Sequence, residues 1–457
     1  MNSRTLPLAT AFLLSLLAPA FGQAASAPAP SPGEPQWFKG NLHTHSLWSD
    51  GDDYPEMIGD WYKRHGYQFL ALSDHNTLHQ GERWFQVNAP IAVDPRQRGG
   101  GEALQKYLQR FGPHWVEQRE QDGKREVRLK PLGEYRALLE EAGRYLLIPS
   151  EEISSSWKRA HTETAPESGG PIHVNATNLR EFIAPVTADN AVAAMQQTVD
   201  AVVEQRRRTG QPMITHINHP NFRWAITAED LMQVRHERFF EIYNGHNGVN
   251  NQGDATHLDM DAMWDAILTF RLAELKLDVM YGIGVDDSHY YHAARIGLSN
   301  SGRGWIMVRA RQLTPESIVH AMEAGDFYAS SGVTLTDVVR TEGRLAIEIQ
   351  AEPGVTYVTQ FIGTRRGFDP TSELIPRAEG TEHQGLPHRR YSKDIGAVLA
   401  EVKGTSASYP FKGDEIYVRA KIVSSKPKPN ASVEGEFETA WTQPAHPAVE
   451  AKPSASR

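Results

Sequence analysis

The sequence predicts an α/β fold: a distorted, seven-stranded, TIM-like β/α barrel with a long insertion, followed by a small C-terminal β-rich unit. Through residues 37–333, short apolar runs alternate with amphipathic helical patterns, as in parallel strands joined by crossover helices. Residues 80–130 interrupt this alternation and are expected to be an inserted functional loop. After Val333 apolar and polar residues alternate, with Leu345, Ile347 and Ile349 on one face, which indicates β-strands.

The N-terminus has the pattern of an export signal. Residues 1–4 are basic, residues 6–22 are largely apolar, and Ala25-Ser26-Ala27 has the small-x-small form of a cleavage site. We therefore expect a signal peptide over residues 1–27, a Pro-rich linker over 28–36, and a protein exported to the periplasm or secreted. The alternative is that this segment is retained as a membrane anchor. The apolar run is short for a membrane-spanning helix, so no stable anchor is expected.

Each element of the barrel has a local signal. The expected strands are 37–45, 67–73, 145–152, 172–175, 213–218, 239–243 and 279–285, and the main expected helices are 135–143, 192–208, 228–234 and 258–275. Thr227 to Asp230 has the form of a capping box, and Thr314-Pro315-Glu316 begins a helix that Gly325 can end. The barrel then spans residues 37–333, the β-rich unit 334–441, and a disordered Pro/Ala/Ser-rich tail 442–457.

Composition narrows the function classes. The 457 residues include 47 Lys and Arg against 56 Asp and Glu, a formal net charge of −9, which argues against binding of a nucleic-acid duplex. The chain has no Cys, so disulfides, zinc ribbons and Cys nucleophiles are excluded. Its 19 His, together with Asp and Glu, must build any metal site.

Residues of metal-binding type recur where six of the seven expected strands end. His43 and His45 lie on the same face of the first strand because side chains alternate along a strand, and Asp50 follows in a turn. Further candidates along the chain are His75, Glu151 or Glu152, His173, His216 or His219, Asp287 and His289.

The position of these residues is more informative than any one pair. Parallel α/β barrels build their active sites at the carboxyl ends of the strands. Several imidazoles gathered there would repel one another when protonated and would be buried polar groups when neutral, and bound cations resolve both problems. The sequence therefore predicts a polynuclear metal site.

The ordered motifs resemble those of the polymerase and histidinol phosphatase (PHP) superfamily over about residues 37–333. The motifs are His43-x-His45, Ser49-Asp50-Gly51, Ser73-Asp74-His75, Glu152, His219-Pro220 and Asp287-x-His289. The resemblance implies a distorted seven-stranded barrel with two or three divalent ions. It implies one ion held by His43, His45, Glu152 and Asp287, a second by Glu152, His173 and His219, and a third by Asp50, His75 and His289. Glu151 in place of Glu152, and His216 in place of His219, stay open as alternatives.

The resemblance also implies a reaction class. Imidazole and carboxylate ligands suit zinc, manganese or iron, and a bound water whose pKa falls toward about 7 would supply the attacking hydroxide. The assigned catalytic residues are His75, Glu152 and Asp287. We favour a phosphoesterase that acts on a small, anionic ester. The segment 303–332 resembles larger exported members of the superfamily, including carbamate hydrolases, so a carbamate or carboxyl ester hydrolase is one alternative. A non-catalytic metal- or ligand-binding exported protein is another.

Further residues are expected to support the ligands or to contact the substrate. Asp74 and Asp286 could orient imidazoles, Asn244 and His246 could contact substrate, and Arg303 could clamp a phosphate; each could also be structural. In the carbamate alternative an apolar pocket would be lined by Trp48, Trp84, Phe85 and Trp224.

Overall fold

The computed structural model describes residues 33–87, 101–159, 168–376 and 386–447. The expected signal peptide and residues 28–32 of the expected linker lie outside the described residues. The chain divides into Met1–Glu34 and one compact unit, Pro35–Arg457. Within the described part of the chain, no helix is both long enough and apolar enough to span a membrane.

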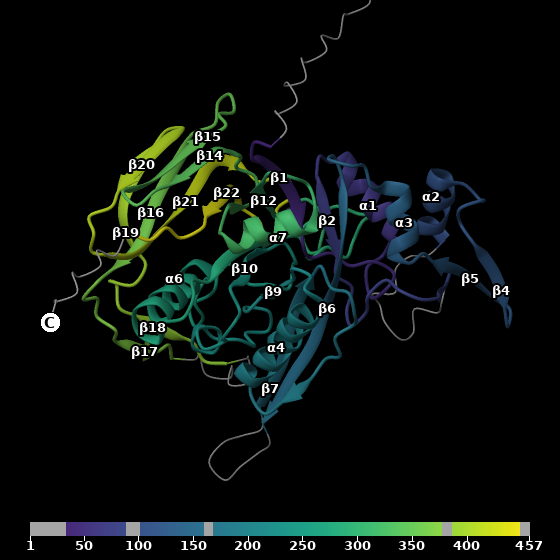
Figure 1. The fold of residues 1–457 in the computed structure, drawn as a ribbon, viewed down its shortest axis with the longest axis horizontal. Helices are drawn as coiled ribbons and strands as arrows, with labels where there is room; N and C mark the ends of the chain where they lie inside the picture. Colours follow the sequence, from purple (N-terminus) through teal and green to yellow (C-terminus); the bar gives the residue numbers. More distant parts are fainter. Residues whose placement is uncertain (1–32, 88–100, 160–167, 377–385, 448–457) are drawn as a thin grey trace, which may run out of the picture. The chain divides into compact units, whose positions relative to one another are not determined.

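The structure is mixed α/β with a large central sheet and few helices (Figure 1). The helices are α1 (Pro55–Arg64), α2 (Gly101–Phe111), α3 (Leu132–Leu139), α4 (Ala191–Thr209), α5 (Ala228–Leu231), α6 (Met260–Phe270), the π-helix η1 (Arg271–Leu275) and α7 (Pro315–Glu323). The strands up to the end of the expected barrel are β1 (Gln36–Asn41), β2 (Phe69–Leu72), β3 (Arg83–Gln86), β4 (Gln118–Gln121), β5 (Lys124–Leu129), β6 (Leu146–Arg159), β7 (Ser168–Thr177), β8 (Thr187–Ala188), β9 (Ile214–Ile217), β10 (Phe239–Asn244), β11 (Tyr281–Val285), β12 (Trp305–Ala310) and β13 (Phe327–Ser330). The strands of the C-terminal region are β14 (Leu335–Arg340), β15 (Arg344–Ile349), β16 (Tyr357–Arg365), β17 (Ser372–Leu374), β18 (Arg389–Tyr391), β19 (Ala397–Lys403), β20 (Ser406–Pro410), β21 (Glu415–Pro427) and β22 (Phe437–Thr442).

The seven expected barrel strands correspond to β1, β2, β6, β7, β9, β10 and β11, which lie side by side in that order. The two ends of this run meet just beyond β1 and β11, where Thr44 and Ser288 form a single parallel bridge. The sheet also continues from β1 into β12, β13, β22, β21, β16 and β19. A closed, all-parallel seven-stranded barrel is therefore not confirmed, whereas the α/β class with a large sheet is.

The strand β7 differs from the expectation, because it runs antiparallel to both β6 and β9. A parallel crossover needs a dozen or more residues, usually with a helix, and the chain between β6 and β7 is too short for one. The two strands instead form a hairpin whose pairing runs from Ser150 opposite Thr177 to Arg159 opposite Ser168. His173 consequently lies within a strand of this hairpin and not at the carboxyl end of a parallel strand.

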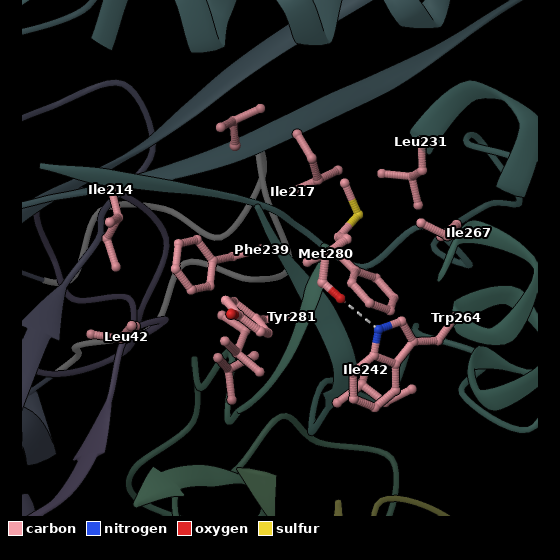
Figure 2. Packing of buried hydrophobic residues seen from close by; sticks show 14 of the residues in the cluster. Leu42, Ile214, Ile217, Leu231, Phe239, Ile242, Trp264, Ile267, Met280 and Tyr281 are labelled. Carbon is pink, nitrogen blue, oxygen red and sulfur yellow. Dashed lines mark hydrogen bonds between the residues drawn. The ribbon is translucent and has the colours of Figure 1, made fainter. Parts of the chain in front are cut away.

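The main core fills the space between the sheet and α4 to α6. Figure 2 shows part of it: Phe239 and Ile242 of β10 lie near Tyr281 of β11, and Trp264 of α6 packs there. The indole nitrogen of Trp264 donates to the carbonyl oxygen of Met280 at 2.8 Å. This bond satisfies the polar end of a large buried side chain, as buried indoles require.

Some of the expected helix boundaries match the structure: α4 lies within one residue of its expected ends, whereas α3 begins three residues and ends four residues earlier than expected, and α5 ends at Leu231. The Thr227 side chain accepts from the backbone of Asp230 and completes the capping box of α5. Thr314 caps α7, and Gly325 follows that helix with a φ of 68°, a left-handed conformation that favours glycine. The expected helix 258–275 begins at Met260 and changes to a π-helix after Phe270.

The insertion forms a small structured layer. The strands β3, β5 and β4 make an antiparallel sheet, and α2 packs its apolar side on it. This cluster also takes in Leu47, Trp48 and Tyr54, from the segment between β1 and α1. The insertion is therefore anchored to the turn that carries Asp50.

Four C-terminal strands, β22, β21, β16 and β19, continue the main sheet, which β22 joins by pairing with β13. The strands β14, β15 and β20 form a separate sheet, and β17 pairs with β18. Leu345, Ile347 and Ile349 are buried, as their alternation predicts. On β21, residues 417–420 are buried on both faces, and the buried Arg419 pairs with Asp265 of α6 at 2.6 Å. The expected tail also begins later than Thr442, because that residue ends β22. The next residue, Gln443, accepts from the backbone nitrogen of Gly282 through Oε1 and donates to its carbonyl oxygen through Nε2. Residues 448–457 lie outside the described residues.

Candidate metal centre

The structure brings all nine candidate ligands together. His43 and His45 follow β1, His75 follows β2, Glu152 lies on β6, His173 on β7, His219 follows β9, and Asp287 and His289 follow β11, with Asp50 in the turn after His45. Groups of these side chains place their ligand atoms within 4.8 Å of one another. The convergence predicted from the strand ends is therefore present in the structure.

The first group contains His43, His45, Glu152 and Asp287, and several of its ligand atoms lie about as far apart as those around one tetrahedral ion. The His43 Nε2 atom lies 3.1 Å from His45 Nε2, 3.3 Å from Asp287 Oδ1 and 3.5 Å from Glu152 Oε1. The His45 Nε2 atom lies 3.2 Å from Asp287 Oδ1 and 3.3 Å from Glu152 Oε2. A tetrahedral ion bound at about 2.0–2.1 Å separates its ligand atoms by about 3.3–3.4 Å. The structure therefore brings the four side chains of the implied first ligand set together, with Glu152 facing His43 through Oε1 and His45 through Oε2.

The second group is centred on Glu152. His173 Nδ1 lies 2.9 Å from Glu152 Oε1, and His75 Nδ1 lies 2.8 Å from Glu152 Oε2. His219 Nε2 is farther away, 3.6 Å from Glu152 Oε1 and 3.9 Å from Asp287 Oδ2. Here His75 lies closer to Glu152 than the implied ligand His219 does, and His219 stands between this group and the first.

The third group surrounds Asp50. Its Oδ1 atom lies 3.3 Å from His289 Nε2, 3.5 Å from His45 Nδ1 and 3.7 Å from His75 Nε2. The implied trio of Asp50, His75 and His289 is therefore joined by His45, whose other ring nitrogen faces the first group. Both His45 and His75 lie between two groups, so the three groups form one continuous centre.

The structure favours one residue in each open pair. Glu151 points away from the centre and accepts a hydrogen bond from the backbone of Ile183 at 3.1 Å, while five candidate imidazoles lie within 4 Å of Glu152. His216 lies behind His43, with its Nε2 atom 3.3 Å from Glu241 Oε1. Glu152 and His219 are thus the members that face the centre.

The turns that carry the ligands depart from ordinary backbone geometry. Asp287 has a φ of 47°, and Asn76, next to His75, has a φ of 49°. A Cβ atom at Gly51 would lie 2.4 Å from the carbonyl oxygen of His45, so only glycine fits beside Asp50. Positive φ values are uncommon outside glycine and cluster at functional sites.

The carboxylates of the centre are held in the ionised form. Burial by itself would raise the pKa of Glu152, but the charges of the imidazoles, that of His75 first, hold this pKa well below its usual range. The pKa of Asp287 is likewise raised by burial and lowered further by its neighbours, His43 first. Burial lowers the pKa of His75, but Glu152 outweighs this effect and raises it to about 9. The protons on the imidazoles balance charge that cations could balance instead.

The side chains fit divalent ions. Glu152 Oε2 and His173 Nδ1 are buried, and in the described residues neither has a partner in hydrogen-bond geometry. Such orphaned atoms are costly unless a ligand satisfies them. Nitrogen and carboxylate donors also suit zinc, manganese and iron.

Glu241 of β10 is a functional residue that the sequence analysis missed. It is fully buried, and its Oε1 atom lies 2.6 Å from His43 Nδ1. Its Oε2 atom accepts from the backbone nitrogen of His219 at 2.8 Å and from Asn244 Nδ2 at 2.7 Å. The distance to His43 is that of a hydrogen bond, so Glu241 orients a candidate ligand. The sequence feature that could have indicated this role is a carboxylate within an otherwise mostly apolar strand.

Asn244 and His246 lie beside the centre as expected, but Asn244 has a different role. Its Nδ2 atom donates to Asp287 Oδ2 at 3.0 Å, so it orients a candidate ligand and does not face a substrate. The ring of His246 lies 5.2 Å from that of His289, and its Nδ1 atom accepts from Gly248 N, which leaves Nε2 as the donor.

Two carboxylates that were expected to orient imidazoles, Asp74 and Asp286, contact mainly other parts of the chain. Asp74 bonds to His79 Nε2 at 2.6 Å and to the backbone nitrogen of Ser46 at 2.8 Å, so it holds the turn before Asp50. It reaches the candidate ligand His45 through Ser49, whose Oγ atom lies 2.5 Å from Asp74 Oδ1 and 3.4 Å from His45 Nδ1. Asp286 accepts from the backbone nitrogens of residues 302–304 at 2.6–2.8 Å, which makes it a strand-end cap.

The expected phosphate clamp at Arg303 is also corrected. The side chain is fully buried, and its guanidinium donates to the carbonyl oxygens of Gly245 at 2.8 Å and of Arg295 and Asn430 at 3.2 Å. A guanidinium engaged with backbone carbonyls holds loops together and has no free face for a phosphate.

No protein-family profile and no curated protein matches the chain. The chain is similar to a solved structure from Bacteroides vulgatus, described as a two-domain protein containing a predicted PHP-like metal-dependent phosphoesterase. The two are 13% identical, with a TM-score of 0.34, and the match covers 92% of this chain and 100% of the other. Similarity at this level carries no inference about activity, which must rest on the ligand geometry.

Proposed function

We propose that the protein is an exported metal-dependent hydrolase that cleaves small, anionic phosphoesters. The observation that carries the proposal is the continuity of the three ligand groups, with Glu152 shared between two of them and His45 and His75 each facing two. Adjacent sites with shared ligands are the arrangement that two-metal phosphoryl-transfer centres require. Zinc, manganese or iron bound there would activate a water molecule and neutralise charge on the phosphoryl oxygens.

The residues of the chain orient this centre. Glu241 accepts from His43 Nδ1, so the His43 Nε2 lone pair faces the first group. Asn244 donates to Asp287 Oδ2, which leaves Oδ1 toward His43 and His45. These contacts fix the ligand atoms before any cation arrives, and this preorganisation keeps the cost of binding low.

Solvent reaches the centre from one side. The side chains of His43, His45 and Glu152 are fully buried, whereas His75 is 26%, Asp50 30% and His173 16% exposed. A substrate would therefore enter past Asp50, His75 and His173. His246 Nε2 could donate to a substrate oxygen from beside His289.

The carbamate and carboxyl ester alternative has less support. Trp48 and Trp224, two of the aromatic residues expected to line its apolar pocket, are buried and stacked on His79 and His257. Three ligand carboxylates facing up to three divalent ions would leave an excess of positive charge, which favours an anionic substrate.

The proposal is tested on purified protein by metal analysis and a substrate panel. We expect two or three equivalents of a divalent metal, and turnover of phenyl phosphate or bis(4-nitrophenyl) phosphate that exceeds turnover of 4-nitrophenyl acetate and an aryl carbamate. The His43→Ala variant should lose metal and phosphoesterase activity together. Faster turnover of the carbamate or acetate would favour the alternative, and metal binding without any turnover would favour a non-catalytic role.

A further inference from the structure

The loop that follows His219 has an unusual backbone. Arg223 has a φ of 54° and Trp224 a φ of 52°, so two consecutive residues other than glycine are left-handed. Such a pair is strained, and strained residues persist only where the surroundings hold them. The loop begins at a candidate ligand, so its conformation bears directly on the centre.

Several contacts hold this loop in place. The Trp224 indole stacks on the His257 ring at a centroid distance of 3.9 Å and an angle of 3°. The Trp224 carbonyl accepts from the backbone of Leu386, which belongs to the C-terminal region, at 2.9 Å. On the other side, Phe222 forms an antiparallel bridge with Val249. The strained conformation is therefore held from both sides.

The loop presents an aromatic ring to the centre. The centroid of the Phe222 ring lies 5.0 Å from that of His219 and 6.4 Å from that of His173, on the side where solvent enters. It also lies 6.0 Å from the His246 ring. A Cβ atom at Gly248 would lie 3.2 Å from Phe222 Cε2, so the ring is closely packed from behind.

The loop also presents a cation. The guanidinium carbon of Arg223 lies 5.3 Å from the centroid of the Phe222 ring, and the residue is exposed. In the described parts of the chain this guanidinium forms no ion pair with a carboxylate, whereas that of the buried Arg419 pairs with Asp261 and Asp265. A strained backbone that holds an exposed arginine on an aromatic ring beside a metal centre has the features of a recognition element.

We propose that Phe222 and Arg223 form a substrate-recognition ledge, in which Phe222 packs against an apolar or aromatic leaving group and Arg223 binds a second anion at its far end. The inference rests on the proposed phosphoesterase function and narrows its substrate class to phosphoesters whose leaving group carries a carboxylate or a second phosphate. Arginine suits both anions, because its planar fork binds carboxylate and phosphate in the same bidentate way.

The test compares phenyl phosphate with 4-carboxyphenyl phosphate and 1,4-phenylene bisphosphate. For the wild-type enzyme we expect a lower KM for at least one of the two substrates whose leaving group carries a second anion, and comparison of the two shows whether carboxylate or phosphate is preferred. Arg223→Ala should raise that KM about tenfold, the loss expected for one charge-assisted contact, while kcat and the KM for phenyl phosphate stay unchanged. Alanine retains the Cβ atom, so the backbone strain at residue 223 is the same in both proteins.

The control is Arg235→Ala, which removes another exposed arginine near the opposite, amino end of β10 and should change neither KM. Equal KM values for all substrates in the wild type, or an Arg223→Ala variant with unchanged KM ratios, would overturn the ledge while leaving the phosphoesterase intact. If the wild type hydrolyses none of the esters, the proposed function fails. Calorimetric titration of the zinc-loaded protein with phenylphosphonate and 4-carboxyphenylphosphonate then decides the ledge separately: tighter binding of the carboxylated compound, lost in Arg223→Ala, supports it, and equal binding refutes it.

Discussion

Replacing Glu241 with glutamine should weaken metal binding by reversing the tautomer of His43. Glu241 Oε2 accepts from two groups that can only donate, the backbone nitrogen of His219 and the Asn244 amide. The single oxygen of glutamine must take that position, which turns its NH2 group toward His43 Nδ1. His43 can satisfy this donor only by accepting at Nδ1, and the ring proton then moves to Nε2, where a metal would bind.

The size of the effect follows from the contact that is lost. The hydrogen bond between Glu241 and His43 is short, at 2.6 Å, fully buried and charge-assisted. Burial raises the pKa of Glu241, but the charge of His43 and the His216 contact outweigh this and hold it at about 2, so the carboxylate is ionised at neutral pH. A hydrogen bond to a charged group contributes about 1.5–3 kcal/mol, which corresponds to a roughly 10- to 150-fold loss of metal affinity.

The assay is a chelator competition for zinc, read by mass spectrometry, with the His43 tautomer read by nitrogen NMR. Glu237→Gln is the matched control, because Glu237 is also buried beside β10, where it accepts from the backbone nitrogens of Arg238 and Phe239, at 2.8 and 2.9 Å, and contacts Thr215. We expect the melting temperature of Glu241→Gln to stay near that of the control while its zinc affinity falls. Equal zinc affinities in the two variants, or a His43 ring that keeps its proton on Nδ1, would refute the reasoning.

Three further outcomes are expected. Because Glu152 raises the pKa of His75 to about 9, a metal ion that binds below that pH must displace a proton from His75. The apparent affinity for zinc should therefore rise with pH, up to about tenfold per pH unit, and level off above pH 9. A flat pH profile in chelator competition would contradict this. Burial raises the pKa of Glu56 to about 7, so the folded state binds the proton more tightly than the unfolded state. The contribution of this group to the free energy of unfolding should therefore fall by about 3 kcal/mol between pH 4.5 and 7. In urea unfolding, Glu56→Gln should remove that loss at pH 8 and should change the free energy of unfolding little at pH 4.5. Gln can keep the bonds from Tyr107 and Trp115, since both reach the same carboxylate oxygen. Arg303→Ala should lower the free energy of unfolding by about 3 kcal/mol or more through unpaired carbonyls, with KM for phenyl phosphate unchanged; a selective rise in KM would restore the phosphate-clamp hypothesis.

Local patterns were sufficient to predict most candidate ligands. His43 and His45 share a strand face, Glu152 and Glu151 face opposite sides, and the structure follows that alternation. The choice of His219 over His216 required the structure, because both lie near the end of β9 and only the path of the chain decides which ring turns inward.

Supporting contacts were predicted less well, because they depend on partners far away in the sequence. Glu241 lies 198 residues from His43, and nothing near it in the sequence indicates that pairing. Asp74 and Asp286 were expected to orient imidazoles because each precedes a candidate ligand in the sequence. On a strand or extended turn, however, neighbouring side chains point in opposite directions, and these two carboxylates face Ser46 and residues 302–304 instead.

Periodicity and contacts a few residues long were enough to predict the residue types of the centre, the strands and most helices that carry them, and the caps at Thr227 and Thr314. Three features could be seen only in the folded chain: β7 is antiparallel, the sheet continues into the C-terminal strands, and Arg303 is buried away from the centre. Strand direction, sheet continuation and burial are set by which distant segments pack together, and that information is absent from any local stretch of the chain.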